Sequence, residues 1–154
     1  MVRGGLYKFM TYRPYQAIKS TGIELKYKND SGVILNKAIP VRAKANGDLD
    51  FINVSVEADV FAIVGVTSEN ILVGSTGGVI SAGRIETITT TFAFGDPVYV
   101  SKSGGLTNIK PEVGVGGFVG GDFIVRVGTI AKNETNPTLK DLVLELHLVG
   151  QLGA

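Results

Sequence analysis

The feature that most constrains this chain is a succession of short apolar runs, each rich in valine, isoleucine, threonine or phenylalanine. β-Branched and aromatic residues favour strands, and the glycine, asparagine, aspartate and proline residues around the runs mark turns. Turn signals at intervals of roughly 8–12 residues predict a sandwich or barrel of short strands. The runs are IELKYK, GVILNKAIPVRAKA, FINVSVEADVFAIVGVT, ILVGS, GGVISA, ETITTTFAF, PVYVS, VGVGGFVGG, FIVRVGTI and DLVLELHLVGQL.

Alternation of side chains supports strands in several of these runs. In Asp141–Val149 the leucines at 142, 144, 146 and 148 point one way, whereas Glu145 and His147 point the other. A period of two predicts a half-buried strand. The density of β-branched residues in Thr87–Phe94 disfavours a helix. One short helix is expected, within Val54–Ala62.

The predicted fold class is therefore all-β: a compact β-barrel or β-sandwich domain behind an extended N-terminal arm. We expect the arm to span residues 1–22 and the domain residues 23–154. A chain of 154 residues is long enough to bury one proper core. No secretory h-region and no run of 18 apolar residues is present, so we expect no membrane partner.

The stretch VGVGGFVGG, residues 113–121, poses the question of nucleotide binding because five of its nine residues are glycine. A dinucleotide fingerprint needs G-x-G-x-x-G before a helix, but the third glycine position falls on Val119 and a strand-like run follows. The GK[ST] ending of a phosphate loop is also missing. The pattern instead predicts a strand bent by glycine, with Val113, Val115 and Val119 facing a core.

No catalytic or metal-binding constellation is evident, so we expect no enzyme, no cofactor, no metal and no catalytic residue. The chain has no cysteine and one histidine, His147, which argues strongly against a zinc site. Asn46, Asp48 and Asp50 resemble the start of a calcium loop, but Glu57 is out of register for the closing ligand. These three residues predict a turn.

Charge is placed unevenly along the chain. Residues 1–23 hold four basic side chains and no acidic one, while the remaining 131 residues hold 11 basic and 14 acidic side chains. The segment also holds four of the twelve aromatic residues, which disordered tails usually lack. We expect the arm to dock on its own domain or on a neighbour; a loose, solvated terminus is the alternative.

The candidate partner-binding residues are the rings and cations of this arm. Rings that alternate with cations can also stack on bases and meet phosphates, but four charges make a thin footprint, so we do not expect nucleic acid as the partner. The candidates are Arg3, Tyr7, Lys8, Phe9, Tyr12, Arg13, Tyr15 and Lys19.

GDPVYVSKSGGLTN, residues 95–108, predicts a hairpin in which Val98 and Val100 share a face and Ser103-Gly104-Gly105 turns the chain. This hairpin resembles one in the small capsid decoration (cement) proteins of tailed bacteriophages. FAIVGVTSENILVGSTGGVISAGRIETITTTFAFGDPVYVS is similar to that family's central pattern, and VRVGTIAKNETNPTLKDLVLELHL to its closing strands. The likeness spans roughly residues 25–148. One difference is Gly114-Val115-Gly116-Gly117, which stands where the family strand has G-x-A.

The resemblance implies a tulip-shaped β-barrel that forms a homotrimer and binds the major capsid protein on the outside of the assembled shell. It implies a non-enzymatic virion protein, made in the host cytoplasm. The arm is not part of the family pattern; we expect its rings to anchor the protein to the shell, since aromatic residues dominate interface energetics, and its cations to meet an acidic shell surface. The alternatives are a tail, baseplate or fibre component of the virion, a glycan-binding β module, which would usually carry an exposed tryptophan, and an enzyme.

Overall fold

The computed structural model describes residues 22–154, which form ten strands and one short helix. Most strands fall on the apolar runs, whereas β8 lies outside them and β3 overlaps one only at Phe51. Glycine or asparagine stands at many of the turns between the strands. In chain order the elements are β1 (Ile23–Lys28), β2 (Pro40–Ala43), β3 (Leu49–Phe51), α2 (Glu57–Phe61), β4 (Ile63–Thr67), β5 (Thr76–Ala82), β6 (Arg84–Ile88), β7 (Pro97–Val100), β8 (Leu106–Thr107), β9 (Phe123–Lys132) and β10 (Lys140–Gln151).

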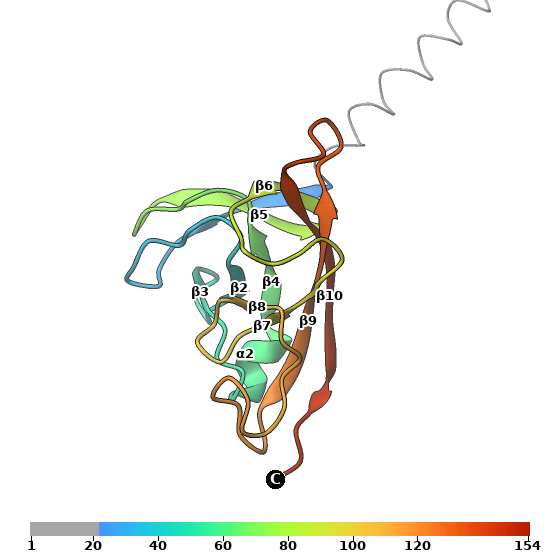
Figure 1. The fold of residues 1–154 in the computed structure, drawn as a ribbon. Helices are drawn as coiled ribbons and strands as arrows, with labels where there is room; N and C mark the ends of the chain where they lie inside the picture. Colours follow the sequence, from blue (N-terminus) through green and yellow to red (C-terminus); the bar gives the residue numbers. More distant parts are fainter. Residues whose placement is uncertain (1–21) are drawn as a thin grey trace, which may run out of the picture.

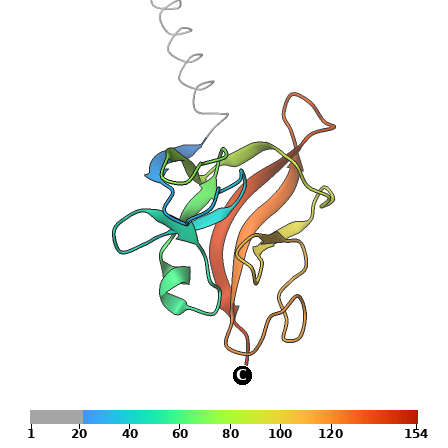
Figure 2. The same ribbon diagram turned by 90° about the vertical axis from the view of Figure 1, so that its left-hand side faces the viewer.

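The strands build two five-stranded antiparallel sheets (Figures 1 and 2). The first has the order β1-β5-β4-β2-β3 and curls into a half-barrel. Its two edge strands meet at one end, where the backbone N–H of Asp30 donates to the Leu49 carbonyl at 3.1 Å. The second sheet has the order β6-β10-β9-β7-β8 and contains the long β9–β10 pair that runs the height of the molecule in Figure 1.

Gly83 joins the two sheets. It stands between β5 and β6 with a φ of +111°, a conformation that favours glycine, so the chain bends out of one sheet and into the other. Its carbonyl accepts a hydrogen bond from the backbone N–H of Leu144 at 2.8 Å, which ties the bend to β10. The main core lies between the sheets, around Val66, Ile80 and Leu142, and a second core fills the half-barrel.

The structure confirms the all-β fold class and several of its elements. β10 covers Lys140–Gln151, with Leu142 fully buried and Glu145 and His147 exposed. The predicted hairpin consists of β7 and β8, and Val98 and Val100 are both fully buried. The expected helix is the five-residue α2, which begins at Glu57.

The prediction of a bent strand over residues 113–121 is wrong. The segment is a loop of consecutive turns, in which Gly114, Gly116, Gly117 and Gly121 all have positive φ. Val113, Val115 and Val119 are 59%, 36% and 54% exposed, so they do not face a core. The buried ring of Phe118 anchors the loop instead, and so many left-handed residues prevent a continuous ladder.

The strand expected over residues 86–94 is only partly present, because β6 ends at Ile88. Thr87 has a φ of +52°, which is uncommon for a β-branched residue, and it lies where the register of β6 against β10 shifts, between the Ile85–Leu142 and Ile88–Lys140 pairs. Residues 89–96 then cross to β7 without regular pairing.

The predicted N-terminal arm lies outside the described residues, apart from Gly22. Within residues 22–154, helices long and apolar enough to span a membrane are not found.

Candidate interaction surfaces

The predicted partner-binding residues all lie outside the part of the chain that the structure describes, so their role stays a prediction. They are Arg3, Tyr7, Lys8, Phe9, Tyr12, Arg13, Tyr15 and Lys19.

Of the residues that resembled a calcium loop, Asn46 and Asp48 form the turn between β2 and β3, as predicted, whereas Asp50 lies within β3. The backbone N–H of Lys44 donates to the Asp48 carbonyl at 2.8 Å, and the Asn46 side chain accepts from the Asp48 N–H at 3.0 Å. Asp50 faces Arg42 instead, with 3.4 Å between its Oδ2 and the guanidinium nitrogen. Within residues 22–154, no group of three or more histidine or carboxylate side chains is placed to hold a metal ion.

His147 lies on the exposed side of β10, where its Nδ1 is 3.1 Å from the Glu145 carbonyl oxygen. This contact lies within its own strand. Among residues 22–154, no nucleophilic side chain forms a hydrogen bond with the imidazole of His147.

Two buried aspartates that sequence reasoning did not single out hold loops together. The first is Asp122, whose carboxylate accepts hydrogen bonds from Lys102 Nζ at 2.6 Å, Ser55 Oγ at 2.7 Å and the Val119 N–H at 2.9 Å. Burial alone would raise the pKa of Asp122, but these bonds outweigh it and hold the pKa below its ordinary value. The ionised carboxylate thus ties the glycine-rich loop to the β7–β8 turn.

The second is Asp141, which is fully buried at the start of β10. It accepts from Arg84 Nη1 and the Thr87 N–H, both at 2.8 Å, and from Asn133 Nδ2 at 3.0 Å. Burial again opposes ionisation, and the hydrogen bonds from Thr87, Asn133 and Arg84 hold the pKa of Asp141 below its ordinary value. An aspartate before a strand indicates only a turn in sequence, so no local pattern could have revealed this network.

Within residues 22–154, these networks satisfy the buried polar side chains. In the described part of the chain, every buried side-chain nitrogen and oxygen has a hydrogen-bond partner. A ligand pocket usually presents a few polar groups that converge on the ligand. In the described residues, side-chain polar groups that are free to bind a ligand therefore lie only at the surface.

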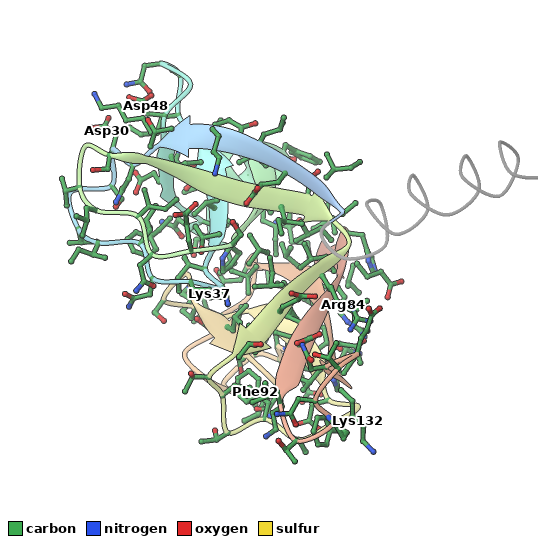
Figure 3. All side chains as sticks on the ribbon, turned by 90° about the horizontal axis from the view of Figure 1, so that it is seen from above. Asp30, Lys37, Asp48, Arg84, Phe92 and Lys132 are labelled. Carbon is green, nitrogen blue, oxygen red and sulfur yellow. The ribbon has the colours of Figure 1, made fainter. Side chains whose placement is uncertain are left out.

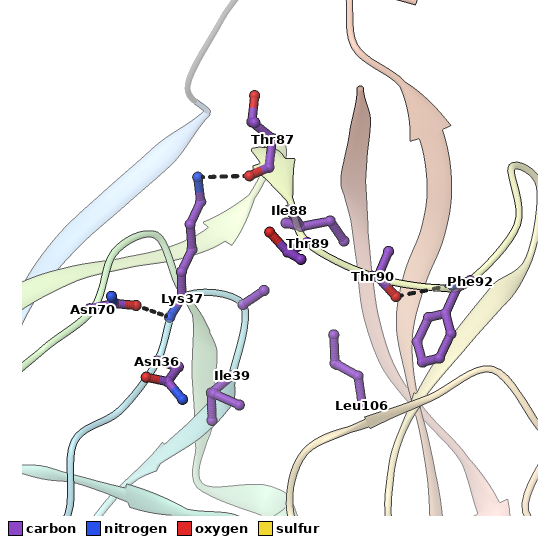
Figure 4. Close-up of a pocket in the computed structure, with 11 residues that line it drawn as sticks. Asn36, Lys37, Ile39, Asn70, Thr87, Ile88, Thr89, Thr90, Phe92 and Leu106 are labelled. Atoms are coloured by element: carbon purple, nitrogen blue, oxygen red, sulfur yellow. Dashed lines mark hydrogen bonds between the residues drawn. The ribbon is translucent and has the colours of Figure 1, made fainter. Parts of the chain in front are cut away.

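A cleft of about 630 Å³ opens between the two sheets (Figure 4). Lys37 spans it, with its Nζ donating to the Thr87 carbonyl at 3.3 Å, and its backbone N–H donates to the Asn70 side chain at 2.8 Å. The lining offers amides, hydroxyls and one ammonium group, which can hydrogen-bond a polar partner. It is formed by Asn36, Lys37, Ala38, Ile39, Asn70, Thr87, Ile88, Thr89, Thr90, Phe92 and Leu106.

A rigid apolar tip is formed by two neighbouring loops at one end of the half-barrel. Its four side chains are Val33, Ile34, Leu72 and Val73, which are 51%, 50%, 59% and 53% exposed. We call these four residues the apolar tip. Exposed apolar residues are normal singly, but four adjacent ones on two loops form a patch of the kind that marks an interaction site.

The backbone beneath the apolar tip is held in place by hydrogen bonds. Leu35 and Ile71 exchange two backbone hydrogen bonds, at 3.0 and 2.7 Å, which set the two loops side by side. The buried Asn29 donates through its Nδ2 to the carbonyls of Val33 and Ile71, both at 2.8 Å. The backbone of the tip is therefore preformed, and a partner need not order these two loops on binding.

An ion pair flanks the apolar tip. Asp30 directly follows Asn29, which holds the tip, and the Oδ2 of Asp30 lies 2.8 Å from Lys44 Nζ. The hydrogen bond from Lys44 lowers the pKa of Asp30. Viewed from above, Asp30 and Asp48 lie at the end of the molecule away from Lys132 (Figure 3). The sequence did not predict the tip, because GVIL and ILV have the composition of core strands.

Neither the family models nor the curated proteins searched match this chain.

Proposed function

We propose that this chain is a structural protein of a tailed-bacteriophage virion that binds the outside of the assembled capsid and stabilises it. Its partners are the major capsid protein and two further copies of itself, in a homotrimer. It acts without catalysis or a cofactor. Because it binds only the assembled shell, each contact shifts the equilibrium toward assembly by mass action.

The observation that carries this proposal is the preformed apolar tip. A surface that repeats across a lattice works best when its loops need no ordering on binding, since the ordering of loops adds to the free-energy cost of association. Val33, Ile34, Leu72 and Val73 stand on loops that Asn29 and the Leu35–Ile71 bridge hold rigid. The tip is therefore suited to seating against an apolar depression on a shell subunit.

Two features of the sequence add support. The resemblance to the decoration proteins covers the β4-to-β7 region and the closing strands β9 and β10. The basic N-terminal segment complements an acidic shell surface and would speed association and fix orientation.

The test is quantitative detection of the chain in purified phage particles that contain it. A shell-binding protein should be present in a fixed number of copies per capsid hexamer, and it should rebind particles from which it has been stripped. A few copies per particle would instead indicate a tail, baseplate or fibre component and would overturn the proposal.

A further inference from the structure

A second apolar surface, distant in sequence from the apolar tip, is a groove of about 330 Å³ beside β10. One wall is α2 with the start of β4, and the other is the second half of β10; Figure 2 shows α2 beside the lower part of the β9–β10 pair. We call it the β10 groove. It is lined by Val60, Phe61, Ile63, Val64, Ser81, Val125, Leu146, His147 and Leu148.

The β10 groove follows a strand edge that has lost its partner. β6 pairs with β10 only as far as Val143, and the last hydrogen bond on that side runs from the Leu144 N–H to the Gly83 carbonyl. Beyond it, in the described part of the chain, β10 pairs with β9 alone. An unpaired edge is a template for another strand.

Apolar side chains rise beside this edge. Phe61 is 69% exposed and Leu148 is 39% exposed, on opposite walls of the groove. A bare edge with such neighbours would favour aggregation, and proteins generally cover edges of this kind with a loop or a further strand. The β10 groove thus has the backbone and the apolar surface that an extended segment needs.

The N-terminal segment, residues 1–21, joins the described chain next to this groove. Ile23 pairs with Ala82, and the preceding residue Ser81 lines the groove. Twenty-one residues span up to roughly 70 Å when extended, at about 3.3 Å each, so the segment can readily traverse the groove of its own molecule.

The N-terminal segment and the β10 groove complement each other in charge and in apolar character. Among residues 22–154, no lysine or arginine lines the β10 groove. Glu57 lies one helical turn from Phe61, and Glu145 precedes Leu146; within residues 22–154 neither carboxylate forms an ion pair. The segment carries four cations and no acid, and its apolar character comes from rings spaced two or three residues apart, at Tyr7, Phe9, Tyr12 and Tyr15.

We propose that residues 1–21 dock in the β10 groove of their own molecule, as an added strand on the free edge of β10. Side chains of a strand alternate, so Tyr7, Phe9 and Tyr15 share the side that enters the groove against Phe61 and Leu148, while Tyr12 lies on the opposite side. The cations lie toward Glu57 and Glu145 or toward solvent. This docking concerns the isolated protein and goes beyond the proposed shell binding, which it neither requires nor excludes.

Amide hydrogen exchange of the full-length protein tests the docking without knowledge of its register. Replacing Tyr7, Phe9, Tyr12 and Tyr15 with serine should accelerate exchange in peptides covering residues 145–149 by about tenfold, if the segment is docked nine-tenths of the time. Peptides covering β7 should be unchanged, which reports that the domain is still folded. Equal exchange at residues 145–149 in both proteins would overturn the proposal.

Cross-linking distinguishes the protein's own groove from a neighbour's. The natural chain has no cysteine, so His147→Cys paired in turn with Lys8→Cys, Arg13→Cys or Lys19→Cys gives unambiguous products with a short bismaleimide. At least one pair should yield a cross-linked monomer, whereas Asn46→Cys in the β2–β3 turn should not replace His147→Cys. Cross-linked dimers alone would show docking on a second copy, and no product would show no docking; either result contradicts the proposal.

Discussion

The Nζ of Lys102 lies 2.6 Å from Oδ2 of the buried Asp122, and this contact joins the β7–β8 turn to the glycine-rich loop. The two residues are twenty positions apart in the sequence, and the segment between them consists mostly of turns and irregular backbone. Because Asp122 also accepts from Ser55 and from the Val119 N–H, one carboxylate holds three segments together.

Replacing Asp122 with alanine should lower the free energy of unfolding by about 1–3 kcal/mol, because Ser55, Lys102 and the Val119 N–H each lose a hydrogen bond to this buried carboxylate. Urea unfolding followed by circular dichroism measures the change. Lys26→Gln is the matched control, since Lys26 pairs with Glu69 across two exposed side chains and should change stability much less. Equal effects of the two substitutions would contradict the structural role of Asp122.

The lowered pKa of Asp141 predicts a loss of stability in acid. A carboxylate whose folded pKa lies below its unfolded value contributes stability above the unfolded pKa, near 3.8, and loses it as pH falls through the folded value. Stability should therefore fall below about pH 4, with each such group adding at most about 1.4 kcal/mol per pH unit to the slope.

The variant Asp141→Asn isolates this contribution. It should be less stable at pH 7 and should show a shallower decline between about pH 4 and pH 2 than the natural protein, in urea unfolding repeated across pH. An unchanged acid slope would show that the titration of Asp141 does not couple to folding.

Close packing of backbones predicts that Gly128 cannot be replaced. A methyl group on this residue of β9 would overlap the Val143 carbonyl on β10, so Gly128→Ala should cost about 1–3 kcal/mol through forced displacement of the strands. Gly150→Ala, on β10, is the matched control, because a methyl group there would project into open space and little change is expected. Thermal unfolding of both variants measures the difference, and equal losses of stability would contradict the packing argument.

The apolar tip should control attachment to the shell. The double variant Ile34→Ser/Leu72→Ser should keep its fold and bind stripped particles about 10–100-fold more weakly, since two half-exposed side chains lose roughly 1.4–2.8 kcal/mol of burial. Co-sedimentation over a range of concentrations measures this. Ile109→Ser/Val113→Ser, which removes two equally exposed side chains from another region, should bind normally. Equal weakening by both pairs would rule out a specific role for the tip.

The sequence by itself determined the elements whose signal is local. Alternation over Asp141–Val149 and the turn at residues 103–105 correctly predicted β10 and the β7–β8 hairpin. Strand propensity and turn chemistry depend on residues a few positions apart, so they can be recognised without knowledge of the rest of the chain.

Only the tertiary structure decided which apolar runs are covered. Val33, Ile34, Leu72 and Val73 have the composition of core residues, yet the pairing of Leu35 with Ile71 places them on an exposed tip. The same holds for Asp122 and Asp141, whose partners come from distant segments, and for residues 113–121, which form a loop around the buried Phe118. Burial depends on what a distant segment places opposite a side chain, and composition and periodicity carry no record of that neighbour.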